Sequence, residues 1–353
     1  MTDITVIGID IAKNYIQVHG ANDKGKVLLK KRLAREKFLP FMANTTRCLI
    51  GMEACGGAHY WATELKKLGF DVKLLSPQKV KKYLDNHNKN DERDAAACAE
   101  AVSRANVTFV PIKTTAQMDI QSIHRVRSLY IRQRTALMNV MRGLLLEFGV
   151  AIRKRESALV KKLNELLDAD NTWLDEENKV IFQDLYNDLK NLDTQIEKHT
   201  KTLEALAKKD ELCQRLQTIE GIGPISATAL IAKIGNGSDF KKGRELSAYL
   251  GLVPKQHSSG DTQRLLGITK HGDRYIRQLL IHGGRSVVQA SKRKNKATGN
   301  YQKQDPHSQW VRQLADRSGT NIASVAVANK NARMVIAILK NKTTFDAKLA
   351  HQF

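Results

Sequence analysis

The first 112 residues carry the pattern that most constrains how this chain can fold. Apolar runs of strand length alternate there with segments of helical spacing. In chain order, the strand-like segments are residues 4–12, 15–23, 26–34, 47–54 and 71–77. A helical segment at 56–70 separates the last two strands, and an alanine-rich helix is expected from residue 91. Strands and helices that alternate in this way usually form a layered α/β structure.

The order of these segments narrows the choice of fold. Three consecutive strands, then a strand–helix–strand unit and a final helix, match the order of an RNase H-like core. The fourth strand-like segment, RCLIGMEA, has the composition of a strand that is buried on both faces. We therefore predict an α/β RNase H-like (RuvC-like) domain over residues 1–112.

Four carboxylates occupy notable positions in this predicted domain. Asp10 in VIGIDIAK and Glu53 in CLIGMEACGG each close an apolar strand-like run. Asp91 and Asp94 in NKNDERDAAA open the alanine-rich helix and, three residues apart, share one helical face. Carboxylates at the ends of adjacent strands and on one helical face can converge on divalent metal ions.

Each carboxylate also has an ordinary structural explanation. Glu53 could cap a neighbouring helix, and Asp91 or Asp94 could be the N-cap of the helix that follows. Two features argue against this. Asp10 and Glu53 adjoin buried apolar strands, where an unpaired charge is costly, and Asp91 and Asp94 face the same direction. We therefore predict a site for Mg²⁺ or Mn²⁺, since hard oxygen ligands accept either ion.

The overall charge indicates the kind of partner. The chain carries 58 Lys and Arg against 36 Asp and Glu, which gives a formal net charge of +22. Such an excess favours a polyanionic partner, although basicity alone also fits a ribosome-associated protein. An acidic cluster within so basic a protein indicates phosphodiester chemistry on nucleic acid.

Cysteine spacing and hydropathy exclude other classes of protein. The four cysteines form no CxxC pair, so we expect reduced thiols and no zinc site: Cys48, Cys55, Cys98 and Cys213. No uninterrupted apolar run approaches the roughly 18 residues that a membrane span needs. We therefore expect a cytoplasmic protein that does not bind a membrane.

The middle of the chain, residues 113–210, has the character of long helices. Apolar residues there recur at alternating spacings of three and four: Phe182, Leu185, Leu189, Leu192, Ile196, Leu203 and Leu206. His199 is the single polar interruption of this heptad seam, and we interpret it as a partly solvated seam residue. The pattern fits equally a coiled coil between chains and an antiparallel hairpin that packs on itself.

A second compact domain is expected over residues 211–353. It opens with LQTIEGIGPISATALIAKIG, whose Gly-Ile-Gly turn between two helical segments is typical of a helix-hairpin-helix element. In such elements the glycines let backbone N–H groups approach a phosphate at a helix N-terminus. A tight turn between two helices without a ligand is the alternative, and Pro224 suits both interpretations.

A glycine- and serine-rich loop lies between helical segments within residues 251–285. Ser258 and Ser259 precede Gly260 there, so that one hydroxyl can stand exposed on a turn. A serine needs a base, a metal or dense positive charge to become a nucleophile. His257 offers a base, and five cations offer charge and a candidate nucleic-acid surface: Arg264, Lys270, Arg274, Arg277 and Arg285. From spacing alone, an ordinary loop with an arginine clamp for the DNA backbone is favoured over a nucleophile.

Six motifs occur in the order found in one known family. They are GIDIAK, GMEACGG and NKNDERDA in the amino half, and TIEGIGPISA, AYLGLVPKQHSSG and ITKHGDRYIRQLLIHGGR in the carboxyl half. On these motifs the chain resembles the DEDD-type insertion-sequence transposases, the bridge-RNA-guided serine recombinases of bacterial mobile elements. The resemblance covers nearly the whole length.

The resemblance implies a role for each site residue. Asp10, Glu53, Asp91 and Asp94 would form the RuvC-like metal-binding tetrad, and Ser259 would be the nucleophile that joins covalently to a DNA phosphate. The choice of Ser259 over Ser258 rests on the resemblance and not on chemistry. The site would be composite, because the tetrad and the serine belong to different domains.

The resemblance also implies partners. An element-encoded RNA would pair with the element ends and the target DNA, and the long helices would assemble a dimer or tetramer associated with the bacterial nucleoid. The expected function is thus a transposase that cuts and rejoins DNA. The alternatives are a RuvC-like, metal-dependent, structure-selective DNA nuclease and a decayed protein that only binds nucleic acid.

Overall fold

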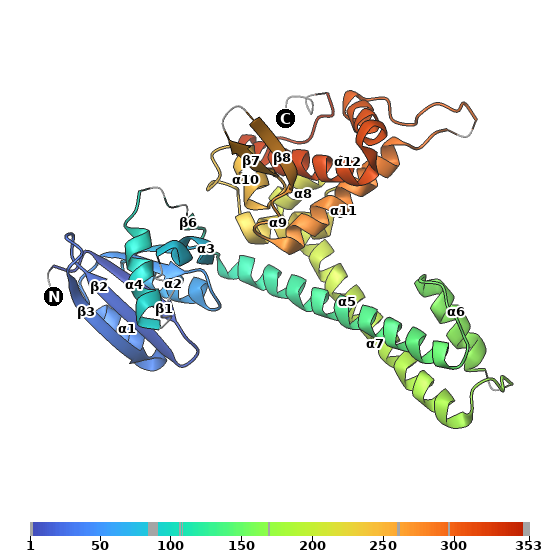
Figure 1. Cartoon of the computed structure of the whole chain (residues 1–353), viewed down its shortest axis with the longest axis horizontal. Coiled ribbons are helices and arrows are strands. Elements are labelled where there is room, and N and C mark those ends of the chain that lie inside the picture. Colours follow the sequence, from blue (N-terminus) through green and yellow to red (C-terminus); the bar gives the residue numbers. More distant parts are fainter. Residues whose placement is uncertain are drawn as a thin grey trace. The chain divides into compact units, whose positions relative to one another are not determined.

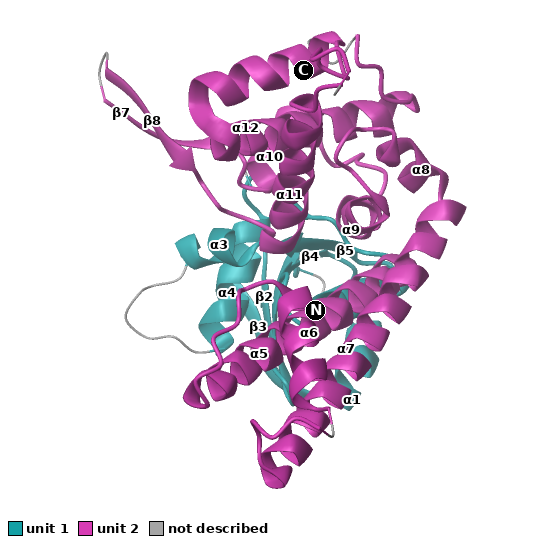
Figure 2. Ribbon diagram, turned by 90° about the vertical axis from the view of Figure 1, so that its right-hand side faces the viewer, with its two compact units in different colours: residues 1–114 teal, residues 115–353 magenta. Residues whose placement is uncertain are grey.

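The structure, a computed structural model, describes residues 3–83, 91–105, 107, 109–168, 170–259, 262–295 and 297–348. The chain divides into two compact units (Figure 2). Unit 1 is Met1–Thr114 and unit 2 is Thr115–Phe353.

Unit 1 is built on a six-stranded sheet with the strand order β3-β2-β1-β4-β5-β6 (Figure 1). The strands are β1 (Val6–Ile11), β2 (Tyr15–Ala21), β3 (Val27–Ala34), β4 (Leu49–Glu53), β5 (Asp71–Leu75) and β6 (Phe109–Val110). β1, β2 and β3 are antiparallel neighbours, β4 pairs parallel to β1, and β5 pairs parallel to β4. The five predicted strands are present, and the prediction of a mixed α/β amino-terminal domain is confirmed.

Helices cover both faces of this sheet. On one face, α1 (Arg35–Ala43) and α2 (Ala58–Lys67) pack over Ile7 and Ile9. On the other face, α4 (Asp91–Val102) packs over β1, β2 and β4. The short helix α3 (Pro77–Val80) and a 3₁₀ turn follow β5. Helix α1 was not predicted from the sequence.

Unit 2 begins with two long helices. α5 (Thr115–Glu147) and α7 (Glu176–Lys209) pack against each other within one chain, with α6 (Glu156–Leu166) between them in sequence (Figure 1). Arg134 forms an ion pair with Asp193 across this helix pair. The ring of Tyr130 stacks on that of His199 at 5.8 Å, so His199 is a half-buried packing residue. Within one chain this is an antiparallel hairpin, and a coiled coil between chains stays a prediction.

The remaining helices of unit 2 form one core. They are α8 (Glu211–Gln217), α9 (Pro224–Ile234), α10 (Gly243–Tyr249), α11 (Arg274–Ser291) and α12 (Pro306–Asn341). The carboxyl-terminal part is therefore mainly helical, as predicted. α12 bends at Gly319, which has a φ of 80°. α12 also contains an apolar stretch long enough to span a membrane, but 67% of that stretch is buried, as in the core helix of a globular domain.

Glycines allow the closest contacts within this core. Gly221, in the turn between α8 and α9, has a φ of +85° and lies against the backbone of Gly283 in α11. The next residue, Gly284, lies against the carbonyl oxygen of Ser324 in α12, where an added Cβ would be 2.3 Å away. Packing thus requires Gly221 to be glycine whether or not its turn binds phosphate.

The segment with the two serines differs from the sequence-based expectation. It is not a loop but a two-stranded antiparallel hairpin of β7 (Pro254–Ser259) and β8 (Thr262–Ile268). Ser259 pairs with Thr262 at its end, and Gly260 lies outside the described residues. All six residues of β7 are exposed. Because both faces of the strand meet water, the sequence shows no apolar alternation there, and the strand was not predicted.

Candidate active site

Two paired glycines determine how close α4 lies to the sheet. Gly8 of β1 and Gly51 of β4 are neighbours in the parallel register. A Cβ at Gly8 would lie 1.9 Å from the carbonyl oxygen of Ala95, and one at Gly51 would lie 2.5 Å from that of Cys98. No larger residue fits at either position, so the helix backbone rests directly on the sheet.

The same two strands carry the first two acidic side chains. Asp10 follows Gly8 by two residues and Glu53 follows Gly51 by two. Because side chains alternate along a strand, each carboxylate leaves the sheet on the face that its glycine opens to α4. The sequence patterns Gly-Ile-Asp and Gly-Met-Glu therefore combine the close approach of the helix with a carboxylate on the same face.

The first turn of α4 supplies two more acidic side chains. Ligand oxygens of Asp10, Asp91 and Asp94 lie within 4.8 Å of one another. Among the described residues this is the one cluster of three or more acidic, histidine or cysteine side chains with such a spacing. Glu53 is not in that cluster, but its negative charge acts on the carboxyl of Asp10. Glu92 points elsewhere and pairs with Lys30 of β3 at 2.7 Å.

The environment of Asp10 favours the binding of a cation. Burial, followed by the negative charges of Asp94, Asp91 and Glu53, raises the pKa of Asp10 to about 6. A divalent cation would replace this repulsion with attraction, and the ligands are the hard oxygens that Mg²⁺ and Mn²⁺ prefer. Burial also raises the pKa of the neighbouring Cys98 thiol far above its ordinary range, so that Cys98 stays neutral. The donor set thus fits a hard divalent ion.

The serine hairpin presents its two hydroxyls on opposite faces. Ser258 pairs with Gln263, and its Oγ accepts a hydrogen bond of 2.9 Å from Nε2 of Gln256 on the same face. Ser259 lies on the opposite face together with His257. Both serines are exposed.

Residues at the base of the hairpin attach it to the core of unit 2. Asp273 caps α11 by accepting from the N–H groups of Tyr275 and Ile276 at 3.0 and 3.1 Å. Gly272 has a φ of 74°, and a Cβ there would meet the carbonyl oxygen of Tyr249 at 1.9 Å. Much of the motif ITKHGDRYIR therefore has a structural role.

The five cations proposed from the sequence do not form one surface. Arg264, Lys270, Arg274 and Arg285 are exposed, and Arg285 donates to Oδ1 of Asn321 at 2.9 Å. Arg277 differs from the others because it is only 8% exposed. Its guanidinium donates to the carbonyl oxygens of Leu250 and His271 at 2.9 and 2.8 Å. Arg277 therefore holds the base of the hairpin and is not placed to contact nucleic acid, contrary to the sequence-based interpretation.

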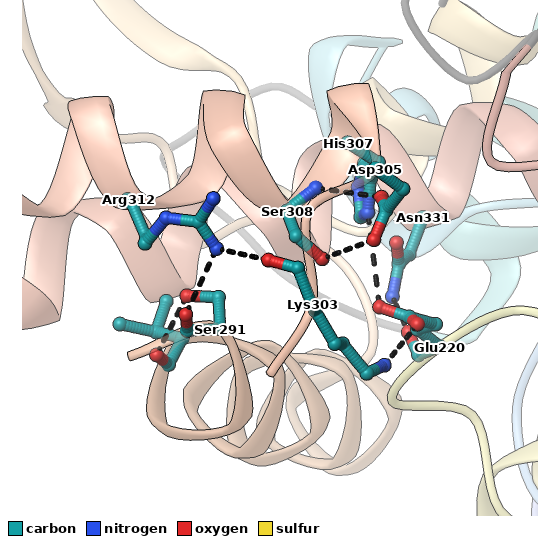
Figure 3. A network of polar contacts seen from close by, with 9 residues as sticks. Glu220, Ser291, Lys303, Asp305, His307, Ser308, Arg312 and Asn331 are labelled. Atoms are coloured by element: carbon teal, nitrogen blue, oxygen red, sulfur yellow. Dashed lines mark hydrogen bonds and ion pairs between the residues drawn. The ribbon is translucent and has the colours of Figure 1, made fainter. Parts of the chain in front are cut away.

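A polar network that was not predicted from the sequence surrounds Glu220, the residue before the Gly-Ile-Gly turn (Figure 3). The Glu220 carboxylate forms an ion pair with Lys303 and lies 3.8 Å from Nδ1 of the buried His307. The Glu220 backbone oxygen accepts from Nδ2 of Asn331 at 2.8 Å. An acidic residue in an otherwise apolar turn was the available signal. The network connects the α8–α9 turn to Lys303, which precedes α12, and to His307 and Asn331 of α12.

Two family descriptions match this sequence. One, "Transposase", with a DEDD motif in its name, covers residues 7–149, and the other, "Transposase IS116/IS110/IS902 family", covers residues 213–300. The first contains all four acidic residues of the proposed tetrad, and the second contains the serine hairpin and α11. A DEDD domain of this kind implies the use of a divalent metal.

Curated relatives match over almost the whole chain. A "Probable family 20 transposase" of Pseudomonas aeruginosa is 41% identical over 97% of this chain and 99% of its own length. The "Transposase for insertion sequence element IS1111A" of Coxiella burnetii is 39% identical over 98% of this chain and 92% of its own. The "Transposase for insertion sequence element IS1328" of Yersinia enterocolitica is 35% identical over 98% and 99%. With both family matches and this coverage, the chain belongs to the IS110/IS116 family of DEDD transposases, enzymes that move insertion sequences in DNA.

Proposed function

We propose that this transposase cuts and rejoins DNA through a covalent serine–phosphate intermediate, with divalent metal bound by the acidic tetrad. The observation that supports the metal site best is the convergence of the Asp10, Asp91 and Asp94 oxygens within 4.8 Å. The raised pKa of Asp10 follows from its burial and from this convergence, and like charges gathered in a half-buried place call for a counter-ion. Glu53 completes the tetrad from the neighbouring strand. Mg²⁺ is the proposed ion, with Mn²⁺ as its substitute.

The bound metal would neutralise charge on the scissile phosphate and lower the pKa of an attacking hydroxyl. The tetrad carboxylates would hold the metal where β1, β4 and the first turn of α4 bring them together. Asp10 must give up its proton to act as a ligand, and in the metal-free protein its pKa is about 6. Protons should therefore compete with the metal below this pH, so that more Mg²⁺ is needed for activity as the pH drops.

Ser259 is the proposed nucleophile. Its Oγ would attack the phosphorus while the bond from phosphorus to one deoxyribose oxygen breaks, and the departing oxygen takes up the proton that the serine loses. His257, on the same face of β7, offers a base for that proton. The reverse attack by a new deoxyribose hydroxyl restores the serine, so strands are exchanged without an external energy source. Ser258 is the weaker choice because Gln256 already donates to its hydroxyl.

The remaining proposals concern partners and organisation. The DNA of the element ends and target would be selected by pairing with an element-encoded RNA. Functionally, residues 1–112 would supply the tetrad, 113–210 would assemble a dimer or tetramer through a coiled coil, and 211–353 would supply the serine. The α8–α9 turn would act as a helix-hairpin-helix element at Gly223, where nothing lies within 4 Å of an added Cβ. Because it would act on chromosomal DNA, the protein would be associated with the bacterial nucleoid.

A covalent-adduct assay tests the mechanism. The protein, co-expressed with the RNA that flanks its gene, is incubated with labelled element-junction DNA and Mg²⁺ and run on a denaturing gel. We expect a protein-linked DNA band that is lost in Ser259→Ala and in Asp10→Asn. Ser258→Ala is the matched control, because it removes the adjacent hydroxyl, and it should keep the band.

Two results would contradict the proposal. Cleaved DNA without an adduct, unaffected by Ser259→Ala, would indicate hydrolysis by water as in a RuvC-like nuclease. An adduct lost in Ser258→Ala and kept in Ser259→Ala would move the nucleophile to the other serine.

A further inference from the structure

A basic groove of about 910 Å³ lies between α5, α9 and α11 of unit 2. None of the tetrad residues and neither serine lines it. The three helices that form it are separated by up to about 150 residues in sequence but are joined by side-chain contacts, such as the 3.0 Å hydrogen bond from Nε2 of Gln117 to the Ile231 carbonyl oxygen.

A buried histidine fixes the floor of the groove. His124 of α5 is 4% exposed, and its Nε2 and Nδ1 lie 3.1 Å from Oγ1 of Thr228 and 3.0 Å from the hydroxyl of Tyr275. The Thr228 hydroxyl donates its proton to the Pro224 carbonyl oxygen at 2.8 Å, so it can only accept from His124. Nδ1 of His124 is then the acceptor for Tyr275. Burial, and secondly the charge of Arg127, lowers the pKa of His124 to about 4, so this floor is rigid and neutral.

The rim of the groove is positively charged. Arg125 and Arg132 of α5 and Arg274 of α11 line it and are exposed. None of these three forms an ion pair within the part of the chain that the structure describes. The lining carboxylate, that of Asp273, caps α11 and pairs with Lys233 at 3.3 Å, so its charge is already compensated. The groove therefore presents cations without matching anions.

The spacing of the arginines favours a polymer over a small anion. Arg125 and Arg132 are seven residues apart, which places them on one face of α5 and about 10 Å apart along its axis. At that spacing each side chain can bind its own phosphate along one strand, whereas a single phosphate would require both side chains to bend toward it. Arginine forks bind phosphate oxygens in pairs of hydrogen bonds, which suits them to this role.

From this charge, spacing and rigid floor, we infer that the groove between α5, α9 and α11 binds the sugar-phosphate backbone of a nucleic acid strand. None of the residues proposed to bind metal or to attack phosphorus lines this surface. RNA and DNA share the backbone chemistry, so either can be the source of the strand, and the test must distinguish them.

The test is a binding titration in EDTA, where no cleavage occurs and the proposed catalytic mechanism plays no part. Fluorescently labelled duplex DNA, single-stranded DNA and RNA of equal length are titrated with the full-length protein at several salt concentrations. The variant is Arg125→Ala with Arg132→Ala. The control is Arg153→Ala with Arg155→Ala, which removes the same charge from two exposed arginines of unit 2 that do not line the groove.

Two phosphate contacts contribute about 1.8 to the slope of log K against log salt for duplex DNA, and about 1.4 for a single strand. We expect the slope of log K against log salt to be smaller by this amount in the groove variant for at least one of the three probes. The affected probe shows whether the groove binds duplex DNA, single-stranded DNA or RNA. The control should keep the wild-type slope. A second variant, Gln278→Glu, adds a carboxylate to the lining without removing an arginine and should weaken binding of the same probe.

Two results would overturn the inference. In one, the groove variant keeps the wild-type slope and affinity with all three probes. In the other, the control variant loses as much as the groove variant, since binding would then depend on total charge and not on the groove. Because all the substituted side chains are exposed, the variants should melt as the wild type does, and the melting curve of each is recorded first.

Discussion

Gly8→Ala should disable the metal site without touching a carboxylate. The new Cβ would lie 1.9 Å from the Ala95 carbonyl oxygen and 2.4 Å from the Ala99 amide nitrogen, both backbone atoms of α4. An ordinary van der Waals contact needs 3.4 Å, so α4 must retreat from β1 by 1.5 Å at this point. Asp91 and Asp94 begin the same helix and would move with it.

The magnitude follows from two costs. Overpacking of this kind destabilises a domain by about 1–3 kcal/mol. The larger effect falls on function, because Mg²⁺ tolerates little departure from oxygen distances of about 2.1 Å. A displacement of about 1 Å at a reacting centre can lower the rate by about 100-fold. We therefore expect Mn²⁺ or Mg²⁺ binding to become undetectable at concentrations that saturate the wild type, and DNA cleavage to fall by about two orders of magnitude.

The assay pairs metal titration by calorimetry with hydrogen exchange of the β1 amides, which reports the local stability of unit 1. Gly56→Ala is the matched control, because Gly56 lies in the same unit and nothing is within 4 Å of an added Cβ. The reasoning is refuted if Gly8→Ala keeps wild-type metal affinity and exchange rates. It is also refuted if Gly56→Ala loses as much as Gly8→Ala, since the loss would then not come from the contact with α4.

Three further predictions follow from particular contacts. In the folded protein the pKa of Asp10 is about 6, above its ordinary value of 3.8. Without metal, the contribution of this side chain to stability is therefore present below pH 3.8 and is lost as the pH rises through 6, because the ionised carboxylate opposes folding. Asp10→Asn should therefore raise the melting temperature of the metal-free protein at pH 7 but not at pH 4, and should abolish the Mg²⁺-dependent rise that the wild type shows at pH 7, as read by thermal scans. Arg277→Gln should lower stability by about 3 kcal/mol, because two buried carbonyl oxygens lose a charged donor, whereas Arg274→Gln should change it by less than about 0.5 kcal/mol in the same denaturant titration. Gly221→Ala should destabilise by about 1–3 kcal/mol through its positive φ and its contact with α11, whereas Gly223→Ala should leave stability unchanged and weaken DNA binding if that turn admits a phosphate.

The strands of unit 1 were predictable from the sequence because burial imposes a regular pattern on them. Ile7 and Ile9 alternate with Gly8 and Asp10, and this period of two marks a strand with two different faces. Helix α1 escaped prediction because Pro40 lies inside it, and proline normally ends a helix. The spacing of the buried Phe38 and Met42, four residues apart, was the remaining sign of a helix.

The carboxyl-terminal site was harder to predict because its local structure lies at the surface or depends on tertiary contacts. β7 and β8 carry almost no buried residue, so hydropathy gave no sign of them. The Gly260-Asp261 pair is a two-residue turn signal that the sequence did contain, but the residues of β7 before it lack strand propensity. No local pattern separates Arg277 from Arg274, since only the packing of the loop before α11 reveals that one guanidinium is enclosed and the other is not.

The sequence motifs of this family contain both residues proposed for catalysis and residues needed for close packing. The spacing of residues in the sequence alone does not show which residue has which role. In unit 1, each acid of β1 and β4 follows by two residues a glycine on which α4 rests. In unit 2, Gly221 meets Gly283, and the segment that includes Gly272 and Arg277 fixes the base of the serine hairpin. A substitution at such a glycine should therefore resemble a catalytic defect in its loss of activity. The glycine substitution would also lower the stability of the protein. Asp10→Asn, by contrast, should abolish activity while it makes the metal-free protein more stable.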